Sequence, residues 1–128
     1  MRKFILLIIL SIITAGIGAQ VMYNSSGKVI GRVSDKVYYD ESGKVLGRIV
    51  GIFIYDGKSK LIGKVDGQTL YDGVGRQIGR IDGNNFYDAL GRLMARLDGE
   101  TLYDSYGRKI RKSSGLNKTD MIIFFYYF

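Results

Sequence analysis

Acidic side chains recur at a fixed spacing and are the residues of this chain best suited to hydrolysis. They are Asp40, Asp56, Asp72, Asp88 and Asp104, each 16 residues after the one before. Two carboxylates a few ångström apart can act as acid and base on a glycosidic bond. Each acid also stands where a turn favours aspartate, however, and the only glutamates, Glu41 and Glu100, form no visible pair. We therefore predict no enzyme, assign no catalytic residue, and keep a carboxylate-dependent hydrolase as the least favoured hypothesis.

Two residue types that carry much of protein chemistry are missing. The 128 residues include no histidine and no cysteine, which removes most zinc sites and the Ser-His and Cys-His nucleophile systems. Calcium would need several carboxylates together, whereas the positions beside the turn aspartates hold serine, glycine, alanine and lysine. We predict no metal and no cofactor. With no nucleic-acid-binding motif in the chain, we also predict no nucleic-acid partner.

Two columns of side chains are candidates for ligand binding. A ring of tyrosines could stack on sugars or bases, and a ring of basic residues could face phosphates or acidic sugars. Cross-strand packing for the tyrosines and a solvated face for the basic residues are the competing interpretations. The candidates are Tyr39, Tyr55, Tyr71, Tyr87 and Tyr103 in the first column and Arg32, Arg48, Lys64, Arg80 and Arg96 in the second.

All these side chains belong to a tandem repeat of six 16-residue units, each reading Tyr-Asp-x-x-Gly-basic-x-apolar-Gly-basic-apolar. In Asp-x-x-Gly the aspartate can cap a turn and the glycine can adopt the positive φ that closes it. We assign this structural role to Asp40, Gly43, Asp72, Gly75, Asp88, Gly91, Asp104 and Gly107. A second signal in each unit, such as Asp66-Gly67, predicts a two-residue type I′ hairpin turn.

Two turns in each unit leave about five residues per strand, which is too short for helices. The strands are rich in β-formers and proline is absent, so we predict an all-β fold. A glycine column, formed by Gly31, Gly47, Gly63 and Gly79, predicts a bulge or a close backbone approach. The predicted hairpin places Gly63 opposite Leu70, which would cover it. Stacked units closed into a ring or barrel would leave no exposed sheet edge.

The segment from Tyr39 to Ile49, YDESGKVLGRI, shows the repeat most clearly. Its pattern, which extends over about residues 21–115, resembles the small exported bacterial proteins called β-flower proteins, in four-fold and five-fold versions. The resemblance implies short hairpins arranged as petals around a central axis, and the count fits about five hairpins. It implies no activity and no active site that could be transferred to this chain.

The two ends of the chain depart from the repeat. Residues 1–19 combine a basic start, an apolar stretch and small residues, which predicts a signal peptide cleaved after Ala19, with an uncleaved anchor as the alternative. Residues 20–116 form the predicted repeat domain, and residues 117–128 form an apolar tail too short to span a membrane. Four interpretations of this tail are open: a final strand covering an exposed edge, a partner-binding segment, an aggregation-prone tail, or a non-native extension.

Three functions are therefore compared. The first is an exported, non-enzymatic domain, periplasmic, at the outer surface or secreted, that acts by structure or by binding. The second is a weak carbohydrate- or polyanion-binding module at the cell envelope, with an envelope glycan or another envelope protein as its partner. The third is the hydrolase. The sequence favours the first.

Overall fold

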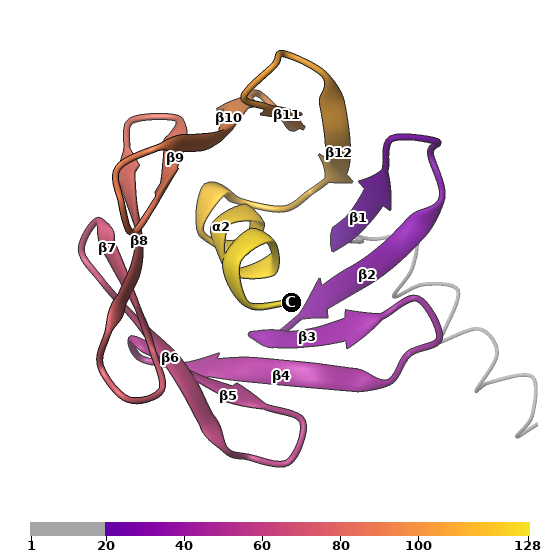
Figure 1. Cartoon of the computed structure of the whole chain (residues 1–128). Helices are drawn as coiled ribbons and strands as arrows, with labels where there is room; N and C mark the ends of the chain where they lie inside the picture. The colour runs from indigo at the N-terminus through magenta and orange to yellow at the C-terminus, as the bar shows by residue number, and fades with distance from the viewer. Residues whose placement is uncertain (1–19) are drawn as a thin grey trace, which may run out of the picture.

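The computed structural model describes residues 20–128, so the predicted signal peptide lies outside the described residues. Twelve antiparallel strands follow one another around a closed barrel, and a helix, α2 (Lys118–Tyr127), occupies its centre (Figure 1). The prediction of an all-β closed array is confirmed. The strands are β1 (Gln20–Asn24), β2 (Val29–Ser34), β3 (Val37–Asp40), β4 (Val45–Val50), β5 (Phe53–Asp56), β6 (Leu61–Asp66), β7 (Thr69–Asp72), β8 (Gln77–Asp82), β9 (Asn85–Asp88), β10 (Leu93–Asp98), β11 (Thr101–Asp104) and β12 (Lys109–Ser114).

The barrel consists of five continuous hairpins and one pair of strands that no turn connects. The hairpins run from β2–β3 to β10–β11, each beginning after one long turn of the Asp-x-x-Gly type and ending at the next, with Asn24 and Ser59 as the two departures from that pattern. The sixth pair is β12 with β1, which we call the seam. Its register matches that of the hairpins, because Tyr23 faces Lys112 as Tyr87 faces Arg80. The barrel is thus closed by the two ends of the repeat domain.

Each two-residue turn lies one residue further along the chain than predicted. Asp66 pairs with Thr69, so Gly67 and Gln68 are the central residues of that turn. Gly67 has a φ of 62° and Gln68 is not among the residues with positive φ, which is the pattern of type II′ and not type I′. Four of the five hairpins follow this pattern. The first hairpin has positive φ at both Asp35 and Lys36, as type I′ requires.

This offset changes what faces the glycine column. Gly63 pairs with Asp72 on one side and with Ile54 on the other, so the prediction that Leu70 covers Gly63 is wrong. A β-bulge lies beside the glycine, because the register of β5 and β6 shifts between Ile54 and Tyr55. The same shift recurs at the equivalent place in each unit, and the bulge predicted there is confirmed.

Aromatic side chains of α2 and of its C-cap residue, Phe128, lie against the glycine column. A Cβ built on Gly31 would meet Phe124, and the corresponding contacts are Phe128 at Gly47, Tyr127 at Gly63 and Tyr126 at Gly79. None of these four glycines has positive φ. The lack of room for a side chain, and not the backbone conformation, therefore explains why these positions hold glycine. The barrel wall adds a ring of fully buried side chains: Met22, Tyr38, Ile54, Leu70, Phe86 and Leu102. The helix therefore completes the core.

The final strand considered for the C-terminal tail is wrong, because Lys118–Tyr127 form a helix inside the barrel. Asn117 caps its start by accepting a hydrogen bond from the backbone N–H of Asp120 at 2.8 Å. Met121, Ile122, Ile123 and Phe124 are buried. Within residues 20–128, no helix combines the length and the hydropathy needed to cross a membrane.

Candidate functional site

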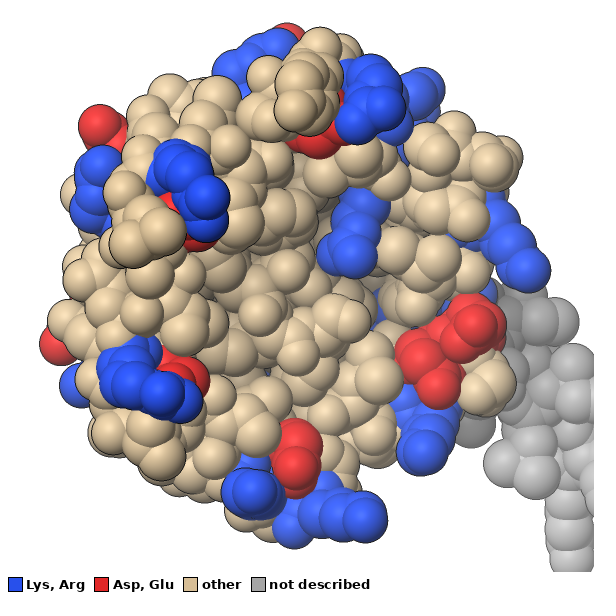
Figure 2. Space-filling model, viewed as in Figure 1, with Lys and Arg blue, Asp and Glu red and all other residues tan. Residues whose placement is uncertain are grey.

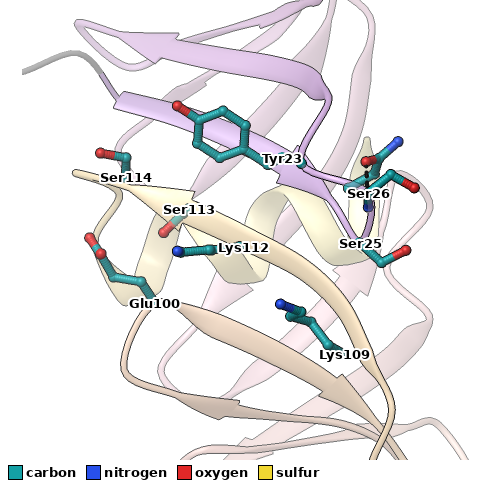
Figure 3. A pocket seen from close by; sticks show the side chains of 10 residues that line it. Tyr23, Ser25, Ser26, Glu100, Lys109, Lys112, Ser113 and Ser114 are labelled. Atoms are coloured by element: carbon teal, nitrogen blue, oxygen red, sulfur yellow. Dashed lines mark hydrogen bonds between the residues drawn. The ribbon is translucent and has the colours of Figure 1, made fainter.

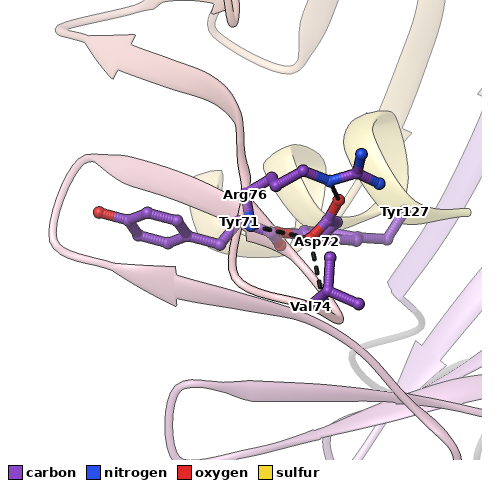
Figure 4. A network of polar contacts seen from close by, with 5 residues as sticks. All are labelled: Tyr71, Asp72, Val74, Arg76 and Tyr127. Carbon is purple, nitrogen blue, oxygen red and sulfur yellow. Dashed lines mark hydrogen bonds and ion pairs between the residues drawn. The ribbon is translucent and has the colours of Figure 1, made fainter.

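The turn aspartates hold the long turns together. In the turn that follows β7, Asp72 Oδ1 accepts hydrogen bonds from the backbone N–H groups of Val74 at 3.0 Å and Arg76 at 2.9 Å (Figure 4). The N–H of Gly75, whose φ is 96°, donates to the carbonyl oxygen of Asp72 at 3.2 Å. The hydrogen bond from the backbone of Arg76 is the largest of the effects that lower the pKa of Asp72.

The other long turns repeat this arrangement. Oδ1 of the first residue caps two backbone N–H groups in every turn, including the one in which Asn24 replaces aspartate. Gly43, Gly91 and Gly107 all have positive φ, and Ser59 adopts the same conformation, with a φ of 66°. Three turns add an ion pair between the aspartate and an arginine four residues later: Asp72–Arg76, Asp88–Arg92 and Asp104–Arg108. The structure thus engages each carboxylate within its own turn and brings no two of them together as a catalytic pair. In the described range, 20–128, no three potential metal ligands of the types His, Cys, Asp and Glu cluster.

The tyrosine column and the basic column are not separate rings. They face each other across neighbouring strands, as Arg32 faces Tyr39 and Arg48 faces Tyr55. In four pairs the cation lies over the ring: Arg48–Tyr55 at 5.4 Å, Lys64–Tyr71 at 4.7 Å, Arg80–Tyr87 at 4.8 Å and Arg96–Tyr103 at 5.1 Å from the centroid. Such contacts contribute about 0.5–1 kcal/mol at exposed sites. Because a cation already occupies one face of these rings, that face is not available for stacking on a sugar.

Among the described residues, two of the six pairs lack this contact: Arg32–Tyr39 in the first hairpin and the pair at the seam. Tyr23 faces Lys112, but no cation–π contact joins them in the described part of the chain. Figure 3 shows Lys112 extended toward the Ser113 end of its strand and not over the Tyr23 ring. A groove of about 610 Å³ lies here. Its lining extends from the first long turn to the far end of the seam: Tyr23, Asn24, Ser25, Ser26, Gly27, Glu100, Lys109, Lys112, Ser113 and Ser114.

A buried polar pair lies near the start of α2. The Tyr38 hydroxyl donates to Asp120 Oδ1 at 2.8 Å, and Tyr38 is fully buried. Burial raises the pKa of Asp120, although the hydrogen bonds from Tyr38 and from the backbone of Asn117 oppose this effect. Burial also raises the pKa of Tyr38. Because Asn117 caps the backbone N–H of Asp120 and Asp120 accepts the hydrogen bond of Tyr38, the pair fixes the helix start against β3.

One residue that the sequence analysis did not single out is Arg111. It stands where the other units have Gly31, Gly47, Gly63, Gly79 and Ala95. Its guanidinium reaches the carbonyl oxygen of Phe124 at 3.5 Å, near the C-terminal end of α2. Burial lowers its pKa. A cation near the C-terminus complements the helix dipole, so Arg111 has a structural explanation. Its departure from the glycine column was the signal that could have identified it.

The model of a family described as 5-fold beta-flower protein matches residues 19–128. No curated protein and no solved structure matches this chain.

Proposed function

This chain belongs to the 5-fold beta-flower protein family, and we propose that it is an exported, non-catalytic domain that binds polyanions at the bacterial cell envelope. The single observation that carries the proposal is the distribution of charge on the barrel. The export part rests on the basic and apolar sequence of residues 1–19.

Charges are sorted into bands along the barrel axis. The outer wall carries a cation belt, which we define as Arg32, Arg48, Lys64, Arg80, Arg96 and Lys112. Five of these six side chains are exposed and Lys64 is intermediate. The two-residue turns and the strand ends beside them carry Asp35, Asp66, Asp82, Asp98 and Glu100, together with one base, Lys36. In Figure 2, most charged side chains lie near the edge of the face that is seen, with basic and acidic groups side by side, and one basic group lies closer to the largely uncharged centre. The belt therefore offers positive charge to a polymer that approaches from the side.

The tyrosines support this use of the belt. Since the rings of Tyr55, Tyr71 and Tyr87 hold their cations close to the wall, the charges are fixed before a ligand arrives. Less side-chain conformational entropy is then lost when a ligand binds than if the cations were mobile. A non-catalytic role is supported by the turn carboxylates, each of which is engaged in a cap. A purely structural role in the envelope is the remaining candidate.

Retention on acidic polymers tests the proposal. Residues 20–128 would be applied to heparin-like and acidic cell-wall polymers at low and high salt, because screening weakens contacts between exposed charges. The belt variant is Arg48→Gln with Arg80→Gln. The matched control, Lys44→Gln with Lys60→Gln, removes the same charge from the long turns.

We expect retention at low salt, less at high salt, and a larger loss in the belt variant than in the control. Absence of retention at low salt would eliminate polyanion binding and leave the structural role. Equal losses in the two variants would show that net charge, and not the belt, determines retention.

A further inference from the structure

The seam is the place where the sixth pair of strands departs from the repeat, and three of its departures change charge in the same direction. Asn24 stands where every other long turn has aspartate. Ser114 stands where the three preceding units have Asp66, Asp82 and Asp98, although the first two units have the uncharged residues Ser34 and Val50. Lys109 stands in a column that otherwise holds Val29, Val45, Leu61, Gln77 and Leu93. Two acids are absent and one base is added within one groove.

The same groove provides neutral hydrogen-bonding groups and an uncovered aromatic ring. Ser25, Ser26 and Ser114 are exposed and line it, and Tyr23 is half-buried beside them. Ser113 also lines the groove, is 1 % exposed, and its Oγ has no hydrogen-bond partner among residues 20–128. This atom is buried and is not accessible to a ligand, so the serine hydroxyls available in the groove are those of Ser25, Ser26 and Ser114.

The one acid in the groove is already engaged. Glu100 lies at the far end, and its Oε2 accepts a hydrogen bond from the backbone N–H of Gly115 at 3.1 Å. Lys109 and Lys112 make no ion pair with an acid within the described range. Five extended residues such as β1 span about 17 Å, so a groove along this strand suits an extended ligand.

We propose that the seam groove binds an acidic oligosaccharide. Lys109 and Lys112 would hold its carboxylate or phosphate groups, the serine hydroxyls and Asn24 would bind ring hydroxyls, and Tyr23 would offer a ring face to a sugar. This site deepens the proposed polyanion binding, because it adds a shaped contact to the general attraction of the belt.

Restoring the repeat's own acids tests the site without disturbing the fold. The test variant is Asn24→Asp with Ser114→Asp. Aspartate at position 24 keeps the oxygen that caps the turn, as Asp40 shows, and Ser114 is exposed. The control, Ser34→Asp with Gln77→Glu, adds two negative charges at exposed positions outside the groove.

Binding would be followed by amide chemical shifts of residues 20–128, with trigalacturonate, glucose 1-phosphate and neutral maltotriose as probes. For trigalacturonate we expect shifts in β1, β12 and the Ser25–Gly27 turn. Because each surface charge contact contributes up to a factor of about five, the test variant should bind more weakly than wild type by up to about 25-fold, and the control should bind nearly as wild type. Glucose 1-phosphate binding at the same amides would extend the site to phosphorylated sugars, whereas failure of this probe alone would restrict the proposal to uronates.

Three results would overturn the proposal: no shift at the seam with either acidic probe, equal affinity of the test variant and wild type, or equal binding of maltotriose. The proposed function fails separately. Loss of polymer retention with intact trigalacturonate binding would remove the role of the belt and leave the seam site. Polymer retention without trigalacturonate binding would remove the seam site and leave the role of the belt.

Discussion

The contact between Gly31 and Phe124 offers a quantitative test of how the helix fits the barrel. A methyl carbon added at Gly31 would lie 2.8 Å from Cε1 of Phe124 and 2.8 Å from the carbonyl oxygen of Tyr39. Carbon atoms pack at about 3.5–4.0 Å, so the ring or the backbone must shift. Overpacking of this kind costs about 1–3 kcal/mol. We therefore expect Gly31→Ala to lower the free energy of unfolding by this amount in urea denaturation.

A double-mutant cycle identifies the ring as one cause of that loss. Phe124→Leu removes the aromatic edge, so Gly31→Ala should cost about 1 kcal/mol less in the Phe124→Leu background than in wild type. Additivity within about 0.5 kcal/mol would refute the reasoning. Ala95 provides a control, because the fifth unit already carries a buried methyl group in this column. Ala95→Gly should destabilise by about 0.5–1 kcal/mol, whereas stabilisation would indicate that the column requires glycine for its backbone conformation.

Three further predictions concern other parts of the fold. In chemical denaturation, Gly79→Val should destabilise the domain more than Arg80→Gln. The valine would enter the space that Tyr126 occupies, whereas Arg80 is exposed. Equal losses of stability would refute the close approach of Tyr126 to Gly79. Tyr127→Phe removes hydrogen bonds to two backbone carbonyls and should cost about 1 kcal/mol or more, and an unchanged melt would contradict these bonds. Burial raises the pKa of Asp120, so its contribution to stability is complete below the unfolded value of 3.8 and is lost as the pH rises through the raised pKa. The stability of Asp120→Asn relative to wild type should therefore be higher at about pH 7 than at about pH 4; a difference independent of pH would contradict the raised pKa.

The local turn signals predicted strand order well, because turns depend on neighbouring residues. The error of one position at Asp66-Gly67 has a physical cause. Glycine can be the second central residue of a type I′ turn or the first central residue of a type II′ turn. An Asp-Gly sequence is compatible with both, so the sequence alone does not distinguish the two turn types. The closed barrel was predictable from the regular repeat, since closure removes sheet edges.

The helix was not predictable from hydrophobic periodicity. Residues Lys118–Tyr127 are surrounded by the barrel, so their apolar side chains show no polar face that would reveal a 3.6-residue period. A short apolar run of this kind cannot be distinguished from a strand. The glycine column predicted that another part of the chain approaches the barrel backbone closely. It did not identify that part as the C-terminal segment.

The candidate site was predicted in part. Tyrosine and basic columns were visible as repeating residues, but their pairing depends on strand register. The seam groove depends on β12 meeting β1, a contact between residues distant in sequence. Lys109 and Ser114 appear ordinary in isolation and become notable only when the six units are aligned.

The central claim is that the regular features of the repeat build a barrel whose core is completed by α2. The most direct measurement is a nuclear Overhauser experiment on residues 20–128 that observes the Hα protons of Gly63 and the ring of Tyr127. We predict strong cross-peaks between them and upfield-shifted Hα resonances, because the ring lies against the glycine. Unshifted Hα resonances with no cross-peak to any aromatic ring of α2 would contradict the account.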